Sequence, residues 1–197
     1  DTFLKDNHSS PAMRNFGAYK YTNAAEYDTA TAQNNTDPGI GKCNSDYVVY
    51  AEGIYVGYRY FETIPGAYDK VRYEFGFGLS YTSFEFSGTL CGESDGKIIA
   101  AVTAKNTGKA SGKEVVQLDY SAPQGKLLKP AKGLAAFKKT KLLSPGESET
   151  VTLCFEVNDM ASYDDLGKIK KSAYILEKGE YKFFIGNSVR NVTELDY

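Results

Sequence analysis

Large apolar side chains recur at every second position in five segments after residue 81. The five sets are Phe84, Phe86 and Leu90; Ile98, Ala100, Val102 and Ala104; Val116, Leu118 and Tyr120; Val151, Leu153, Phe155 and Val157; and Tyr181, Phe183 and Ile185. Successive side chains of a β-strand point to opposite faces, so this period of two predicts strands with one buried face each. Five such strands bury their apolar faces by forming two packed sheets.

Turn signals separate these segments. Ser94 to Gly96 suits a hairpin, Asn106 to Gly108 a turn, and Pro145-Gly146 the central pair of a type II turn. We expect another strand within residues 132–143 and a further edge strand at residues 174–176. Short, regularly punctuated strands predict a mainly β fold, an immunoglobulin-like sandwich of about seven strands.

The first 47 residues differ in character, because they are rich in Asn, Asp, Thr and Ala and poor in large aliphatic side chains. We expect a mostly irregular segment with at most a short helix at residues 23–32, capped by Asn23. This segment cannot build its own core. Its apolar anchors, which need a partner surface, are Phe3, Leu4, Met13, Phe16 and Tyr21.

Residues 47–61 fit two patterns, because their aromatic and aliphatic side chains satisfy both strand and helix spacing. We favour a short helix after Gly53 that ends at residues 64–67, where Pro65 stops it. The spacing of Gly53 and Gly57 lets such a helix approach another element closely.

The composition and charge of the chain exclude several classes of partner. The chain has 197 residues, a net charge of −2 with interspersed signs, and no apolar run near the ~20 residues that span a bilayer. We therefore expect neither a nucleic-acid nor a membrane partner, and no cofactor. The polar start lacks the build of a signal peptide. Cys43, Cys91 and Cys154 favour reduced thiols in a cytosolic protein, although one disulfide plus a free thiol also fits.

Several ordered blocks carry a family resemblance. They are residues 50–61 (YAEGIYVGYRYF), 73–82 (YEFGFGLSYT), 106–118 (NTGKASGKEVVQL), 137–139 (FKK), 143–151 (LSPGESETV) and 179–188 (GEYKFFIGNS). In this order they resemble the C-terminal region of family 3 glycoside hydrolases, the β-glucosidase-type enzymes. The resemblance implies that residues 1–75 are the tail of an α/β sandwich domain plus a linker, and that residues 76–197 are a fibronectin type III-like domain.

The resemblance further implies a parent enzyme that hydrolyses terminal β-glycosidic bonds with retention, through a covalent glycosyl-enzyme. The catalytic groups of that family lie on parts that this chain lacks, so we expect a non-catalytic scaffold whose partners are the remaining catalytic domains, on the same or a separate chain. The resemblance also implies a carbohydrate substrate as the partner of the complete enzyme. The aromatic residues expected to pack against neighbouring domains are Tyr55, Tyr58, Tyr60, Phe61, Phe75 and Phe77.

Two carboxylates are candidates for a catalytic group. Ser45-Asp46-Tyr47 is the nearest counterpart of the family's nucleophile motif. The residues before it are polar and include glycines, whereas the family's nucleophile follows a buried apolar strand. We therefore expect Asp46 to lie in a solvated loop. Glu52 lies beside Tyr50, Tyr55 and Tyr58, and a carboxylate near the N–H groups of a helix start is the favoured reading. We therefore assign no catalytic, cofactor or metal residue.

We expect the other polar residues near the aromatic run to have structural roles. Glu74 is expected to contact a base such as Arg59 or Arg72, and Arg59 to stack on a ring or pair with a carboxylate. His8 is the sole histidine, and the sequence shows no recognisable residues that would bind a metal or form a catalytic triad with it. The glycines of residues 76–81 match neither a nucleotide fingerprint nor a nucleophile elbow and favour a tight bend.

An alternative function is an independent carbohydrate-binding or cell-surface interaction module that shares the sandwich fold. Flat aromatic rings stack on the apolar face of a pyranose. The tyrosines left free of a predicted core face are Tyr19, Tyr21, Tyr68 and Tyr163.

Overall fold

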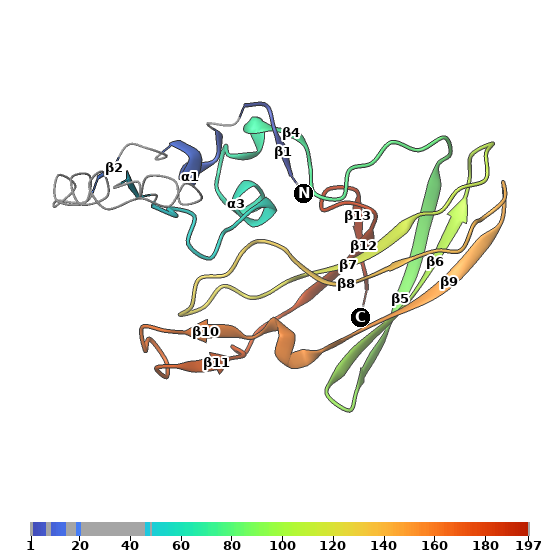
Figure 1. Ribbon diagram of the computed structural model, residues 1–197. Coiled ribbons are helices and arrows are strands. Elements are labelled where there is room, and N and C mark those ends of the chain that lie inside the picture. The colour runs from blue at the N-terminus through green and yellow to red at the C-terminus, as the bar shows by residue number, and fades with distance from the viewer. Residues whose placement is uncertain (1, 7–8, 15–18, 21–45, 48, 197) are drawn as a thin grey trace, which may run out of the picture. The chain divides into compact units, whose positions relative to one another are not determined.

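The structure, a computed structural model, describes residues 2–6, 9–14, 19–20, 46–47 and 49–196 (Figure 1). The chain divides into two compact units, one of residues 4–53 and one of residues 1–3 with 54–197. The first unit contains α1 (Pro11–Arg14) and the antiparallel pair of β2 (Tyr19–Lys20) and β3 (Asp46–Tyr47). The division between the units falls within β1 (Phe3–Leu4). The helix predicted at residues 23–32 lies outside the described residues.

The second unit opens with α3 (Tyr58–Thr63), the 3-10 helix η2 (Tyr68–Lys70) and β4 (Val71–Tyr73). A second 3-10 helix, η3 (Val157–Met160), lies between β9 and β10. The remaining strands are β5 (Phe84–Ser94), β6 (Lys97–Asn106), β7 (Val115–Ser121), β8 (Gly133–Lys139), β9 (Ser148–Glu156), β10 (Ser162–Asp164), β11 (Ala173–Ile175), β12 (Lys182–Gly186) and β13 (Val192–Glu194).

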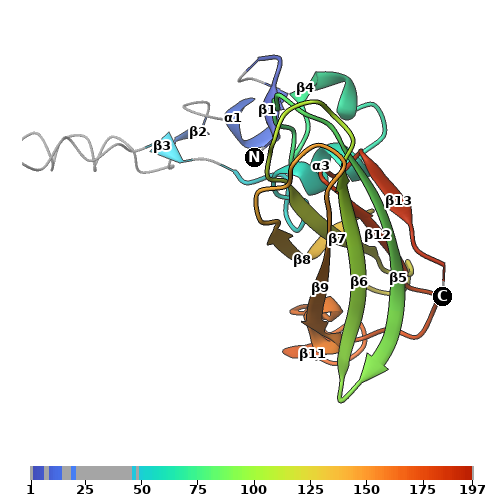
Figure 2. The same cartoon turned by 90° about the vertical axis from the view of Figure 1, so that its right-hand side faces the viewer.

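Two antiparallel sheets form the body of this unit. One has the strand order β13-β12-β7-β8 and the other β5-β6-β9, and the three long strands of the second sheet run side by side in Figure 2. The apolar faces meet in one core, whose members are Ile98, Ala100, Val102, Ala104, Val116, Leu118, Val151, Leu153, Phe155, Met160, Phe183, Ile185 and Leu195. The period-two pattern predicted most of these positions, and the predicted β-sandwich is confirmed.

The predicted turns and extra strands are also present. Asp95 and Gly96 both have positive φ (52° and 75°), as a two-residue hairpin turn between β5 and β6 requires. Gly146 has φ 81°, and the Glu147 N–H donates to the carbonyl of Ser144, which closes the turn at Pro145-Gly146. The strands expected within residues 132–143 and at 174–176 appear as β8 and β11.

The predicted helix after Gly53 begins later than expected, at Tyr58. Gly53 and Gly57 both adopt the left-handed region, with φ 57° and 66°, so the chain turns twice before a helix can start. The helix ends as predicted, because Ile64 is already extended before Pro65.

Candidate functional site

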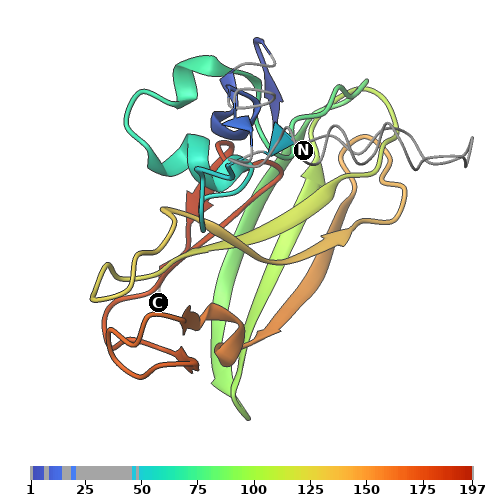
Figure 3. The same cartoon turned by 60° about the vertical axis from the view of Figure 1, so that its left-hand side comes forward.

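Residues 54–75, here called the linker segment, pack on the outer face of the four-stranded sheet (Figures 1 and 3). The backbone N–H of Leu134 donates to the Tyr58 hydroxyl at 2.9 Å, and the N–H of Ala131 donates to Thr63 Oγ1 at 2.9 Å. Phe61 is buried at 6% exposure. The linker segment therefore covers a sheet face that usually meets solvent in a sandwich.

An ion pair joins this segment to Arg190, which lies between β12 and β13. Arg190 Nε lies 2.7 Å from Glu62 Oε2, and the Arg190 guanidinium sits 3.5 Å from the centroid of the Tyr68 ring. Burial raises the pKa of Glu62 above its ordinary value, although the hydrogen bond and positive charge of Arg190 oppose the rise. Arg190 thus holds two parts of the linker segment at once.

Asp119 of β7 is buried beneath this segment. Its exposure is 0%, and neither carboxylate oxygen accepts a hydrogen bond within the described part of the chain. Burial raises its pKa to about 7, with the charge of Lys132 opposing the rise and that of Glu62 adding to it. Lys132 Nζ donates to the Val189 carbonyl at 2.9 Å and lies 4.9 Å from the Phe184 ring centroid, and burial lowers its pKa.

A tight bend at Gly76 follows the linker segment. The N–H of Val189 donates to the carbonyl of Phe75 at 2.9 Å, and a Cβ at Gly76 would meet Gln117 Nε2 at 2.5 Å and the Asn187 carbonyl at 2.7 Å. Gly76 also has φ 91°, so both the backbone conformation and the lack of space for a Cβ exclude other residues at this position. The predicted bend is confirmed at this glycine.

The partner predicted for Glu74 is wrong. Its carboxylate accepts a hydrogen bond from the Ser188 hydroxyl at 3.1 Å instead of meeting Arg59 or Arg72. Arg59 lies over the Tyr58 ring, 5.7 Å from its centroid, as the stacking alternative predicted. The hydroxyl of Ser188 is brought to Glu74 by the same bend that places Val189 on Phe75.

The two candidate carboxylates, Asp46 and Glu52, lie in the first compact unit. Asp46 is part of β3, which pairs with β2, so the expectation of a loop at this position is wrong. Glu52 does serve a helix start, but that of α1. Its Oε1 accepts hydrogen bonds from Ser10 Oγ and from the N–H of Ala12, each at 3.1 Å. His8 lies outside the described residues.

The four candidate sugar-stacking tyrosines have different environments. Tyr21 lies outside the described residues, and Tyr19 belongs to β2. Tyr68 is covered by Arg190. Tyr163 is 52% exposed on β10, so its ring has an open surface.

Large apolar side chains remain exposed at both ends of the linker segment and in the residues that follow it. Phe77 stacks on Tyr73 with ring centroids 4.6 Å apart, yet both rings are over 40% exposed, and Tyr81 is fully exposed. The exposed set in this part of the second unit is Ile54, Val56, Tyr73, Phe77, Leu79 and Tyr81. The stacked pair of Tyr73 and Phe77 is therefore an exposed aromatic surface of the kind that can serve as an interaction site. Of the six predicted scaffold aromatics, Phe61 is buried, whereas Phe77 lies in this exposed set.

Sequence reasoning missed the buried Asp119 and the half-buried Lys132, which lie close enough for their charges to shift each other's pKa. Both residues lie outside the alternating pattern of inward-facing apolar residues. In an ordinary sandwich such positions face solvent. The adjacent apolar pair Phe183 and Phe184 was the available signal, because it predicts a strand that is covered on both faces.

Among the described residues, no group of His, Cys, Asp and Glu side chains is arranged to hold a metal ion, and no helix is long and apolar enough to cross a bilayer. Cys91 and Cys154 are free and exposed thiols. Cys43 lies outside the described residues.

Comparison with known proteins agrees with this architecture. The fibronectin type III-like domain family matches residues 114–189. A β-glucosidase A of Butyrivibrio fibrisolvens is 58% identical over 169 residues, which cover 78% of this chain and 20% of that protein. A β-glucosidase of Ruminococcus albus is 49% identical over 152 residues, covering 77% of this chain and 16% of the relative. The structure of a β-glucosidase from Paenibacillus barengoltzii matches with TM-score 0.78 at 43% identity, over 100% of this chain and 19% of that one.

The second unit is therefore a fibronectin type III-like β-sandwich with a docked linker segment. The chain corresponds to the part of family 3 glycoside hydrolases of β-glucosidase type that contains this domain, and the resemblance predicted from the sequence is confirmed. It spans about a fifth of the length of the relatives to which it was compared.

Proposed function

We propose that this chain is the non-catalytic scaffold portion of a β-glucosidase-like hydrolase that cuts terminal β-glycosidic bonds with retention. The observation that carries the proposal is the set of exposed apolar side chains at the start of the linker segment and around the bend at Gly76. Ile54 and Val56 precede α3, and Leu79 and Tyr81 follow the bend at Gly76. Burial of this surface against catalytic domains would favour association by the hydrophobic effect.

The scaffold would act by holding other domains in place. A catalytic cleft depends on the relative position of its groups, and misplacement by about 1 Å lowers rates by about 10²-fold. The linker segment is suited to transmit such positioning, because Tyr58, Thr63 and Glu62 tie it to the sandwich.

Complementation tests the scaffold role. Hydrolysis of an aryl β-glucoside is measured for this chain alone, for a fragment with the remaining domains of the parent enzyme, and for their mixture. We expect activity only in the mixture. The double variant Leu79→Asp, Tyr81→Asp should lose this activity, because it places charges in the apolar contact.

The matched control is Phe137→Asp, since Phe137 is 67% exposed on β8 and lies outside the exposed set. It should complement as well as the unchanged chain. Turnover by the chain alone would contradict the proposal and make Asp46 and Glu52 the first residues to replace. Full activity of the remaining fragment without this chain would contradict it as well.

A further inference from the structure

The hairpin of β10 and β11 presents two tyrosine rings to solvent. Tyr163 and Tyr174 are directly opposite in the antiparallel register, so their side chains lie on the same face. Their ring centroids are 5.1 Å apart, with an interplanar angle of 60°. Tyr163 is 52% and Tyr174 76% exposed, although the two tilted rings contact each other. The pair is an aromatic surface that the core of the sandwich does not use.

The loop that joins these two strands is held by one carboxylate. Asp164 accepts hydrogen bonds from the backbone N–H groups of Gly167, Lys168, Ile169 and Lys170, at 2.7 to 2.9 Å. Burial alone would raise the pKa of Asp164, but the four donors hold it below its ordinary value. The hairpin therefore keeps its shape without a ligand, which lowers the entropy cost of binding one.

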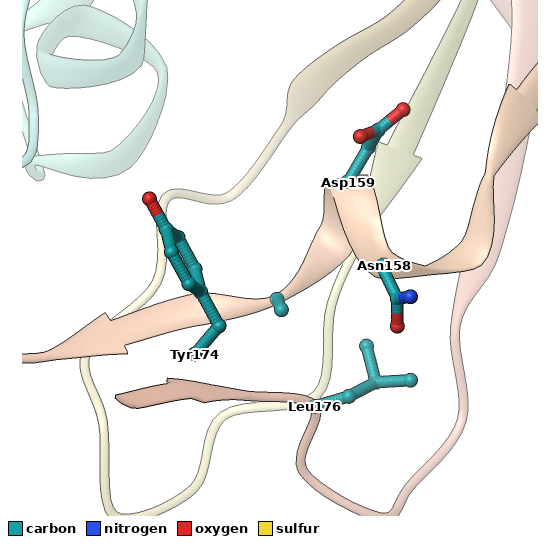
Figure 4. Close-up of a pocket in the computed structure, with 5 residues that line it drawn as sticks. Asn158, Asp159, Tyr174 and Leu176 are labelled. Carbon is teal, nitrogen blue, oxygen red and sulfur yellow. The ribbon is translucent and has the colours of Figure 1, made fainter. Parts of the chain in front are cut away.

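A pocket of about 640 Å³ opens beside this surface, lined by Asn158, Asp159, Ala161, Tyr174 and Leu176. In Figure 4 the Tyr174 ring stands on one side of the opening, with Asn158 and Asp159 of η3 on the other. Asp159 Oδ2 accepts the N–H of Glu156 at 3.3 Å, which fixes this side chain at the rim. Within the described chain the Asn158 amide makes no hydrogen bond, so both its donor and its acceptor are available.

We propose that this pocket binds a neutral pyranose unit of an oligosaccharide, with the sugar ring on Tyr174. A pyranose has an apolar face that stacks on an aromatic ring and a rim of hydroxyl groups. The amide of Asn158 can donate to and accept from such hydroxyls, and the carboxylate of Asp159 can accept from them. The same carboxylate repels acidic sugars. This site lies on the sandwich itself, and the inference does not depend on the scaffold role proposed above.

Titration of the isotope-labelled 197-residue chain with cellotetraose tests the site by nuclear magnetic resonance. We expect saturable shift changes at Asn158, Asp159 and Tyr174. Tyr174→Ala should weaken binding about tenfold, whereas Tyr174→Phe, which keeps the stacking face, should stay within about twofold. Asn158→Ala should weaken binding as well. The control Tyr81→Ala removes a fully exposed ring elsewhere in the unit and should leave the affinity unchanged.

Resonances of the core strands, such as those of Val102 and Leu118, report whether each variant stays folded. The absence of saturable shifts up to about 10 mM cellotetraose would overturn the proposal, as would unchanged affinity of a folded Tyr174→Ala chain. Shifts at this hairpin caused by the remaining domains of the parent enzyme, with none caused by the sugar, would reassign the surface to a protein contact and also overturn it.

Discussion

At the scale of single residues, the most unusual group is Asp119, a carboxylate with 0% exposure and no hydrogen bond in the described structure. Its pKa rises from an ordinary 3.8 to about 7, chiefly because burial disfavours the charged form. The folded state therefore binds the proton more tightly than the unfolded state. The contribution of Asp119 to the free energy of unfolding is fully present below the pKa that it has in the unfolded chain. This contribution is lost as pH rises between about 4 and about 7.

Replacement of Asp119 should remove this pH dependence. We expect the unchanged chain to lose a few kcal/mol of unfolding free energy between pH 4 and pH 8 relative to Asp119→Asn, because only the aspartate must ionise in a buried site. Urea unfolding at several pH values measures the difference. Parallel curves for the two proteins would show that Asp119 does not titrate in this range.

Asn106 shows the opposite case, a buried polar side chain with all its hydrogen bonds made. Its Nδ2 donates to the carbonyls of Ala110 and Leu143, and its Oδ1 accepts from the N–H of Gly108 and the hydroxyl of Thr82. One amide thus closes the turn after β6 and fastens it to neighbouring segments.

Asn106→Ala should lower the unfolding free energy by about 3 kcal/mol, because it leaves several buried partners unsatisfied. Lys105→Ala, an exposed change on the same strand, should cost less than about 0.5 kcal/mol. The comparison is made by urea unfolding at one pH. Equal losses for the two variants would mean that the amide network does not stabilise the fold.

At the scale of elements, α3 and its flanking residues form a third layer on the sandwich. Phe61 is buried at 6% exposure, Glu62 pairs with Arg190, and Tyr58 meets the backbone of β8. The predicted boundary between residues 75 and 76 would cut this layer from the sheet that it covers. We therefore propose that the stable fragment begins near residue 54.

Two fragments test where the folding unit begins. Residues 54–197 should unfold with the same midpoint as the second unit of the full chain, whereas residues 76–197 should lose at least about 3 kcal/mol, because removal of Phe61 and its neighbours exposes buried apolar surface. Urea unfolding followed by tyrosine fluorescence provides the measurement. Equal stability of the two fragments would restore the boundary at residue 76.

At the scale of the whole molecule, the sandwich was predictable because its strands alternate cleanly and its turns carry Gly and Pro at the required positions. The inward residues from Ile98 to Ala104 and the turn at Gly146 were found in this way. Alternation could not reveal the buried outer face at Asp119, because burial there depends on packing by a distant segment. Nor could it reveal the pocket at Tyr174, which needs η3 and β11 to lie together.

The four hydrogen bonds to Asp164 also leave the loop between β10 and β11 unusually open to change. The donors are backbone N–H groups, which every residue except proline possesses. The side chains of Asp165, Leu166 and Lys168 point into solvent and take no part in this bonding. Mutation at these three positions can therefore change the charge and shape of the surface next to the Tyr163–Tyr174 pair while the backbone of the loop keeps its course.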